Sequence, residues 1–456
     1  MSDVANPPPS RPSAPRPARP VFQGAGWRFF GLILITVLMG VPLLMVAFVI
    51  EDRVSYKRQA VSEVSSQWGG AVHLEGPALV IPVLIERDRV IEERDGSERI
   101  ETYTEQAAPI LLMPEELEIT AASASEVRRR GIFEVPVYSV DLAARFGFDV
   151  ARVARVIGER ETVQWDRAFV SVAMPSVRSF SGAAVLETAG RAFDLEPGSV
   201  LGHGGVEARV GDPRGLGAFN LSMRLNGAQR LTFTPTGRLT RVALTSDWAD
   251  PSFDGAFLPT TRSVTPDGFE ATWEIPHLAR EIPQVSRGTG IREVAFGVSF
   301  FNSVDIYHRV QRAAKYGVLF IALTFLTVFL TERLSKRPAH PAQVVLIGIS
   351  QCVFFLLLLS LAEQIGFAAA YVGAAGATIA LITFYGATGL GLGRWWWTLA
   401  APLVVLYAVL NLILRSSDYA LLAGSLLAFV AVALMMILTR RDDWSGGRSG
   451  PHPEPA

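Results

Sequence analysis

Histidine and cysteine are the side chains best suited to bind a metal ion or to act as a nucleophile, and this chain has few of them. His73, His203, His277 and His308 are spread through the polar middle of the chain, and no two have the i, i+4 spacing that places a pair on one helix face. The single cysteine, Cys352, lies within an apolar run, so the middle of the chain has no thiol for zinc, for a disulfide or for catalysis. We therefore expect no metal ion and no cofactor.

Two other patterns that can indicate catalysis have simpler interpretations here. The glycine-rich stretch Gly202–Gly205 surrounds a histidine, but no Gly-x-Ser-x-Gly nucleophile motif occurs in the chain, so a surface turn is favoured over an oxyanion loop. The acid pairs Glu92-Glu93 and Glu115-Glu116 are adjacent in sequence. Adjacent side chains on a strand point to opposite faces, unlike the facing carboxylates of a glycosidase. We expect that the protein is not an enzyme.

The elements that must position any site are dominated by apolar helices. Half of the 456 residues are hydrophobic, and they concentrate in a few runs without internal charge. The hydrocarbon core of a bilayer is ~30 Å thick, and about 20 helical residues cross it. The runs predict six transmembrane helices, at Trp27–Ile50, Tyr316–Thr331, Val344–Ala362, Phe367–Tyr385, Trp395–Leu414 and Tyr419–Leu438. Gly40 and Pro42 predict a kink in the first helix, because proline removes a backbone hydrogen bond.

The distribution of basic residues predicts the orientation of these helices. Basic residues collect on the cytoplasmic side of membrane proteins. One side of the predicted bundle carries nearly all of them, namely Arg11, Arg16, Arg19, Arg28, Arg333, Lys336, Arg337, Arg394, Arg440 and Arg441. This predicts cytoplasmic N- and C-termini, at the ends of disordered tails (1–26 and 439–456), and a periplasmic location for residues 51–315.

Residues 51–315 read as one large β-rich domain inserted after the first helix. Short alternating segments between turn residues predict antiparallel sheets, in a sandwich-like arrangement. Asn226-Gly227 lies between two such segments and predicts a hairpin turn. Ser55–Gln67 predicts instead an amphipathic helix that leaves the membrane. The formal net charge of -1 does not favour nucleic acid as a partner.

Candidate binding residues lie in one aromatic stretch of this domain. Ser246–Pro259 contains Trp248, Phe253, Phe257 and Leu258 among proline and glycine residues. Such a loop either packs over the end of a sheet or forms a docking face for another envelope component. We expect the lipid bilayer as one partner, and other envelope proteins or cell-wall components as further partners.

A second set of candidates lies where the domain meets the membrane block. Tyr307, Arg312, Lys315 and Tyr316 are candidate junction residues, since Arg312 and Lys315 lie where lipid headgroups are expected. Glu332 and Glu363 are candidate interfacial acids at the ends of predicted spans.

Transport is the main alternative to a structural role in the envelope. A transporter or lipid-handling protein with a periplasmic recognition domain would use Glu332 or Glu363 within the membrane. The arrangement of one helix, a domain and five further helices shows no internal repeat of the kind that many transporters have. A cell-wall hydrolase is a further alternative and would need a nucleophile or a metal ion in the domain.

Several motifs of this chain resemble the CreD family of bacterial inner-membrane proteins. They are Tyr307-x4-Arg312-x2-Lys315-Tyr316-Gly317, His340-Pro341-x-Gln343 and Glu363-x-Ile365-Gly366-Phe367, with Ser246–Pro259 and Arg128–Leu142 upstream. The resemblance extends from Ser55 to Tyr385. The chain departs from the family pattern at Gln364, where the family usually has histidine, and at Ser176–Ser179, where the family often has Asp-x-Arg-Gly.

The resemblance implies a protein that supports cell-envelope integrity and has no established enzymatic activity. It also implies links to colicin tolerance and to the response to β-lactams under a two-component system. Together with the residue patterns, it predicts a multi-pass α-helical protein of the bacterial inner membrane with a large periplasmic β domain.

Overall fold

The computed structural model describes residues 25–92, 98–198, 204–288, 294–300, 306–335, 339–415 and 420–440. The chain divides into two compact units, Ser55–Val304 and a unit made of Met1–Val54 with Asp305–Ala456. The sequence predicted a β-rich domain over residues 51–315. In the structure, residues 51–54 and 305–315 at its two ends belong instead to the second unit. The predicted tails 1–26 and 439–456 lie mostly outside the described residues.

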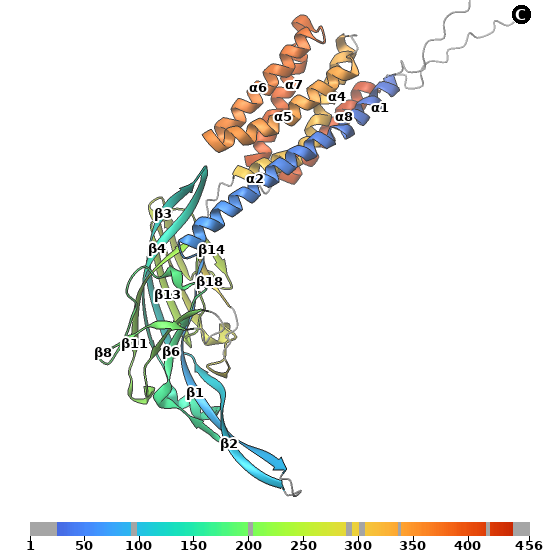
Figure 1. The fold of residues 1–456 in the computed structure, drawn as a ribbon. Helices are drawn as coiled ribbons and strands as arrows, with labels where there is room; N and C mark the ends of the chain where they lie inside the picture. The colour runs from blue at the N-terminus through green and yellow to red at the C-terminus, as the bar shows by residue number, and fades with distance from the viewer. Residues whose placement is uncertain are drawn as a thin grey trace, which may run out of the picture. The chain divides into compact units, whose positions relative to one another are not determined.

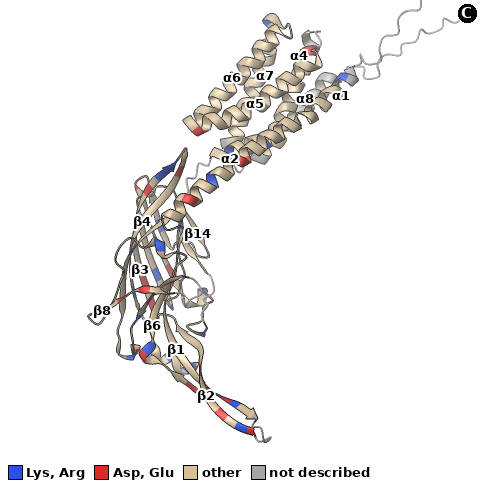
Figure 2. Cartoon of the chain, viewed as in Figure 1, with Lys and Arg blue, Asp and Glu red and all other residues tan. Residues whose placement is uncertain are grey.

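The second unit is helical (Figure 1). Its helices are α1 Ala25–Leu38, the first part of α2 Gly40–Gln67, α3 Ile306–Lys315, α4 Gly317–Ser335, α5 Pro341–Ile365, α6 Phe367–Thr388, α7 Trp397–Arg415 and α8 Ala420–Thr439, with a short 3₁₀ turn, η7 Gly393–Trp395. Figure 2 shows charged residues on α5 and α6 only near an end of α5, as expected for helices surrounded by lipid.

Four helical segments in the described part of the chain are long and apolar enough to cross a membrane. They are Arg28–Gln67, Pro341–Ile365, Phe367–Thr388 and Gly393–Leu414. The pair α3 and α4, bent by 49°, adds a fifth if both helices belong to one span. Several side chains of α8 lie outside the described residues, so the sixth predicted span stays a prediction. These helices and the β unit together form a membrane protein with a large β-rich domain.

The helix is interrupted at Met39, next to the position where the sequence predicts a kink. Pro42 has no N–H group to donate to the carbonyl group of Leu38, so the regular hydrogen-bond ladder fails at this position. The amphipathic segment predicted at Ser55–Gln67 is the last part of α2, continuous with the apolar part.

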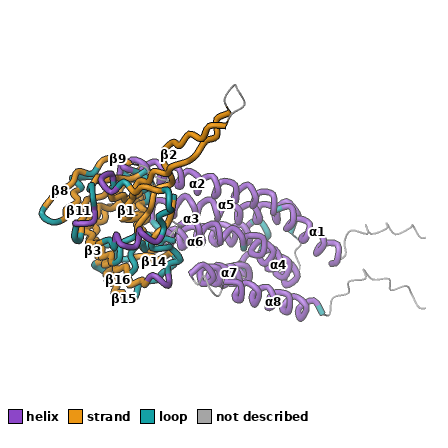
Figure 3. Tube along the Cα trace, turned by 90° about the horizontal axis from the view of Figure 1, so that it is seen from below, coloured by secondary structure: helices purple, strands orange, loops and turns teal. Residues whose placement is uncertain are grey.

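The first unit consists of two sheets, shown in orange in Figure 3. Its strands are β1 Val72–Glu92, β2 Glu98–Leu112, β3 Glu116–Arg130, β4 Phe133–Gly147, β5 Glu161–Val163, β6 Phe169–Ala173, β7 Val185–Thr188, β8 Arg191–Asp194, β9 Glu196–Gly198, β10 Gly205–Arg209, β11 Phe219–Ala228, β12 Arg230–Phe233, β13 Leu239–Ser246, β14 Pro251–Gly255, β15 Thr261–Thr265, β16 Gly268–Pro276, β17 Val285–Arg287 and β18 Phe296–Phe300.

Among the described residues one sheet has ten strands and the other has eight. The ten-stranded sheet runs β14-β18-β12-β1-β6-β10-β9, with β2 and β5 paired to β1 and β17 paired to β2. The eight-stranded sheet runs β15-β16-β13-β3-β4-β11-β7-β8. Most strand pairs are antiparallel, as predicted, but β1 pairs with β12 and β3 pairs with β13 in parallel.

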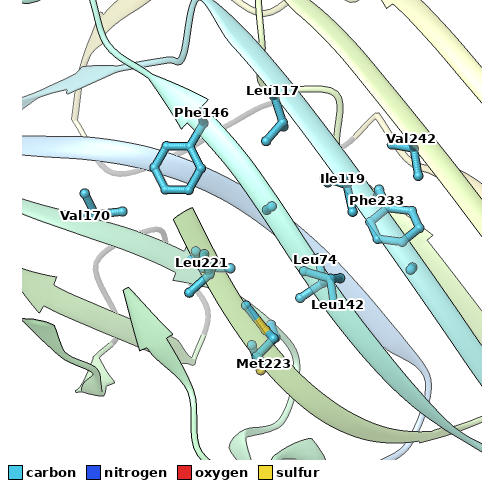
Figure 4. Close-up of a cluster of buried hydrophobic side chains, with 14 of the residues drawn as sticks. Leu74, Leu117, Ile119, Leu142, Phe146, Val170, Leu221, Met223, Phe233 and Val242 are labelled. Carbon is cyan, nitrogen blue, oxygen red and sulfur yellow. The ribbon is translucent and has the colours of Figure 1, made fainter. Parts of the chain in front are cut away.

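The two sheets share one hydrophobic core, which agrees with a sandwich-like arrangement. Alternate residues of β16 are buried, so this strand presents one face to the core. Figure 4 shows side chains of the ten-stranded sheet, such as Leu74 and Phe233, beside Ile119 and Leu142 of the eight-stranded sheet. This rigid core positions the turns at the sheet ends.

The predicted hairpin turn at Asn226-Gly227 was wrong. Both residues lie inside β11, where Gly227 pairs with Tyr138 of β4. The chain turns after Ala228 instead, at Gln229, whose φ is 67°, and it then enters the other sheet as β12. A Cβ atom on Gly227 would lie 2.4 Å from the Tyr138 ring, so glycine is required here by packing rather than by a turn.

Candidate binding cleft

A cleft of about 700 Å³ opens in the β unit. A cavity of this size holds a small organic molecule. Five separate segments of the chain line it: the end of α2 with the turn that follows and the start of β1, the turn after β6, the strand β12, the edge strand β14, and the residue before β18. Its lining is Ser66, Gly69, Gly70, Ala71, Val72, His73, Pro175, Ser176, Arg178, Arg230, Thr232, Asp254, Gly255 and Ala295.

Gly69 joins two walls of the cleft. Its φ of 99° is in the left-handed region that favours glycine, and a Cβ atom would lie 2.6 Å from the carbonyl oxygen of Asn226. The buried Ser179 hydroxyl group donates a hydrogen bond of 3.0 Å to the Gly69 carbonyl oxygen. The turn after α2 is thereby held against the short 3₁₀ turn Val177–Ser179 that carries Arg178.

Arg230 lines the cleft with an exposed side chain, and its neighbours hold it in place. Its Nη2 donates to Asp254 Oδ2 at 3.1 Å and its Nε donates to the Ser299 hydroxyl group at 3.2 Å. The Ser299 hydroxyl group in turn donates to the same Asp254 oxygen at 2.6 Å. The single cleft carboxylate therefore already accepts two hydrogen bonds from these neighbours.

Tyr138 holds the backbone of Arg230 through a hydrogen bond. Its hydroxyl group donates to the Arg230 carbonyl oxygen at 2.6 Å, and burial raises the pKa of Tyr138 far above its usual value. The phenol is consequently a protonated hydrogen-bond donor at any physiological pH.

His73 lies on β1 with both ring nitrogens near threonine hydroxyl groups of the neighbouring segment. Nδ1 is 2.9 Å from Thr232 Oγ1, and Nε2 is 3.1 Å from Thr234 Oγ1. These two contacts join β1 to the segment 232–234 in the wall of the cleft. A histidine with both ring nitrogens engaged in this way is a poor general base. Among the described residues no group of three or more His, Cys, Asp and Glu side chains could hold a metal ion.

Arg178 contributes the second positive charge. Its backbone N–H group donates to the Ser176 hydroxyl group at 3.2 Å, which fixes the turn. Within the described residues its guanidinium group has no side-chain partner, and the side chain is exposed at the cleft. The cleft therefore combines two arginine side chains with one carboxylate that Arg230 already engages.

The aromatic side chains of the stretch proposed as a docking face are partly buried against the core. Trp248, Phe253 and Phe257 pack against the hydrophobic core, and Phe253 contacts Phe269 edge-on with the ring centres 5.5 Å apart. Pro251–Gly255 forms the edge strand β14 rather than a loop. Leu258 differs from the other three because its side chain is 69% exposed.

The candidate junction residues are parts of α3 and of the position that follows it. Tyr307 is buried, and its hydroxyl group donates to Glu363 Oε1 at 2.9 Å. Arg312 is half-buried and Lys315 is exposed, both in the last turn of α3. Tyr316 lies at the bend between α3 and α4.

The two candidate acids lie near helix ends, as expected, and both contact partners. Glu363 accepts the hydrogen bond of Tyr307 near the end of α5. Glu332 lies near the end of α4, where Arg28 Nη1 of α1 is 3.6 Å from Glu332 Oε2. These contacts join helices that are distant in sequence.

The cleft residues were not among the candidates that the sequence indicated. His73 was considered only as a metal ligand, and the turn Ser176–Ser179 only for its missing acid. His203 lies outside the described residues. No local motif links Arg178, Arg230 and Asp254, since the fold alone brings them together from distant parts of the chain.

A family model and a curated relative match almost the whole chain and agree with each other. The family model "Inner membrane protein CreD" matches residues 25–445. The inner membrane protein CreD of Escherichia coli (strain K12) is 32% identical over 429 residues, covering 92% of this chain and 93% of that protein. A solved M1 zinc metallopeptidase from Deinococcus radiodurans aligns over 75% of this chain and 96% of its own, at 10% identity, but a TM-score of 0.19 carries no argument. The family model and the relative show that this chain belongs to the CreD family of inner membrane proteins.

Proposed function

We propose that this protein is a non-enzymatic inner-membrane protein that supports the integrity of the bacterial cell envelope. The observation that carries the proposal is the family match over residues 25–445. In this proposal both chain termini are cytoplasmic, six helices cross the membrane and the β unit lies in the periplasm. The basic residues near the helix ends support this orientation.

The proposed role as a non-enzymatic component has support in the chemistry of the cleft. Its histidine contacts threonine hydroxyl groups at both ring nitrogens, and its carboxylate is paired with arginine. Such a site suits recognition of a ligand better than proton transfer. By family resemblance, we also propose that loss of the protein alters colicin tolerance and the response to β-lactams.

Reporter insertions test the orientation on which this role depends. Alkaline phosphatase is active only after export, so we expect activity when it is inserted at the exposed β7–β8 turn beside Gly190 and no activity when it follows Ala456. A reporter that fluoresces only in the cytoplasm should give the reverse result at the two sites. Phosphatase activity at the C-terminal site together with none at Gly190 would contradict the proposed topology, provided that immunoblots show equal amounts of both fusions.

Transport remains the second candidate function, because Glu332 is in a largely apolar helix and its side chain is only 13% exposed. A transporter would need this acid, or Glu363, to bind or relay an ion within the membrane. The contacts of both acids with Arg28 and Tyr307 favour structural roles instead.

A further inference from the structure

We propose that the cleft in the β unit binds a small organic anion through its oxyanion group, a carboxylate or a phosphate, with Arg178 and Arg230 as the anion-binding residues. The inference goes beyond the proposed function and does not depend on which side of the membrane the unit faces.

The charge balance of the cleft is the first argument. Arg178 and Arg230 line the cleft with one carboxylate, Asp254, and that carboxylate accepts hydrogen bonds from Arg230 and Ser299. The positive charge of Arg178 has no compensating side chain among the described residues. Guanidinium groups bind carboxylate and phosphate through paired N–H groups, so an oxyanion would complete the site.

The rigidity of the walls is the second argument. Arg230 is held by Asp254, Ser299 and the Tyr138 contact to its carbonyl group. Arg178 lies on a 3₁₀ turn that Ser179 ties to Gly69. The Arg230 guanidinium group is therefore already in position, and a donor of this kind loses less conformational entropy when it binds a ligand.

The size and composition of the cleft define the rest of the ligand. A volume of about 700 Å³ exceeds the need of a bare ion. Ala71, Val72, Pro175 and Ala295 add apolar surface beside the arginine residues. The site therefore fits a molecule with an apolar body and one oxyanion group.

Isothermal titration calorimetry on the full-length protein in an uncharged detergent tests this inference. The probes are phenyl phosphate and benzoate, which differ in the oxyanion, and the neutral benzamide as a control. We expect saturable binding of at least one anion, weaker binding at high salt, and no binding of benzamide. Binding of phenyl phosphate alone would identify a phosphate ligand, and binding of benzoate alone a carboxylate ligand.

Substitutions locate the binding within the cleft. Arg178→Gln should weaken anion binding by about tenfold, the usual cost of one lost charged hydrogen bond. Arg178→Lys should recover part of this loss, because it restores the charge. The matched control is Arg209→Gln, an exposed arginine on β10 outside the cleft, which should bind like the unmodified protein.

Arg178 is the decisive position because its side chain supports no described contact, so its variants should fold normally. Arg230→Gln also disturbs Asp254 and Ser299, and its effect is interpreted only if thermal unfolding of the variant matches that of the unmodified protein. The proposal is overturned if neither anion binds, if benzamide binds equally well, or if Arg178→Gln leaves the affinity unchanged.

Discussion

Tyr138 forms a hydrogen bond and a ring contact between the two sheets of the β unit. It belongs to β4 of the eight-stranded sheet, yet its hydroxyl group bonds to the Arg230 carbonyl oxygen on β12 of the other sheet. Its ring also stacks on Phe300, with the ring centres 4.6 Å apart. The neighbouring strand β11 makes room for this ring by having no side chain at position 227. The position of the Arg230 backbone beside the cleft therefore depends on Tyr138 and on the glycine that makes room for its ring.

Gly227→Ala should destabilise the β unit. The new Cβ atom would lie 2.4 Å from the Tyr138 ring and force it to shift. Overpacking of this kind costs about 1–3 kcal/mol of unfolding free energy, measurable by urea denaturation followed by circular dichroism.

The matched control for this substitution is Gly215→Ala, where a Cβ atom would meet nothing within 4 Å. We expect that control to change the unfolding free energy by less than about 0.5 kcal/mol. Equal stability of the two variants would show that the Tyr138 ring moves aside without cost.

The role of Gly227 could not be predicted from the sequence, because it depends on a residue that is distant along the chain. Asn226-Gly227 has the composition of a hairpin turn, but the ring that requires the glycine comes from a strand about ninety positions earlier. Likewise, Arg178 and Arg230 have no local pattern in common. A single sequence reports local propensity, and both sites depend on contacts between distant segments.

Helix α5 shows how a short motif positions a whole element. His340 Nδ1 accepts from the Ala342 N–H group at 3.2 Å, while the Gln343 side chain accepts from the His340 N–H group at 2.8 Å. Gln343 also donates to the carbonyl oxygen of Gly389, just after α6. The family motif His340-Pro341-x-Gln343 therefore begins one helix and ties it to the end of the next.

A second motif acts between α3 and α5. The hydrogen bond from Tyr307 to Glu363 joins the short helix before the 49° bend to the end of α5. If Glu332 and Glu363 have structural roles only, replacing both with glutamine should leave envelope phenotypes unchanged, because glutamine retains an acceptor for Tyr307. The measurement is the β-lactam sensitivity of a strain that lacks the gene. The variant gene should restore the sensitivity of this strain to that of the unmodified strain.

Immunoblots of membrane fractions serve as the control for that experiment, since the variant must be as abundant as the unmodified protein. Tyr307→Phe is a comparison variant that removes the hydrogen bond to Glu363 while both acids stay in place. Loss of complementation by the glutamine variant alone, at normal abundance, would instead favour the transport alternative.

The apolar helices and some of the strands could be predicted, but the pairing of the strands could not. Alternation of apolar and polar residues places β11, β13 and β16, and long apolar runs place α5, α6 and α7. The parallel pairs β1 with β12 and β3 with β13 join segments more than a hundred residues apart, and no turn between them indicates the partner. The bend at Tyr316 was likewise missed, because the polar segment before it looked like part of the β domain.

At the scale of the whole molecule, the uneven distribution of apolar residues was sufficient to predict two units. The boundary at Ser55 falls inside α2, so a single helix contributes to both units. Its last part packs on the β unit, where Val61 and Val64, together with Trp68 just after the helix, contact a small cluster outside the main core. The β unit therefore has its own core, and the end of α2 is part of it.

This arrangement predicts that residues 55–304 fold as a separate domain and that residues 70–304 form a less stable one. Removing the helix end exposes Val135, Val137 and Ala228. It also removes the Trp68 indole group, which donates to the Tyr138 carbonyl oxygen at 3.3 Å and stacks under Arg128 at 3.8 Å. Loss of this half-buried aromatic side chain costs about 1–3 kcal/mol, and we expect a difference of at least this size in urea denaturation.

Trp68→Ala in the longer fragment separates packing from chain length. It should account for most of the difference, whereas Ser66→Ala, with an exposed side chain at the end of α2, should have little effect. If the shorter fragment is as stable as the longer one, the end of α2 is only a connector and the β unit begins at β1. A destabilised short fragment would show instead that the segment leaving the membrane is an integral part of the β domain's fold.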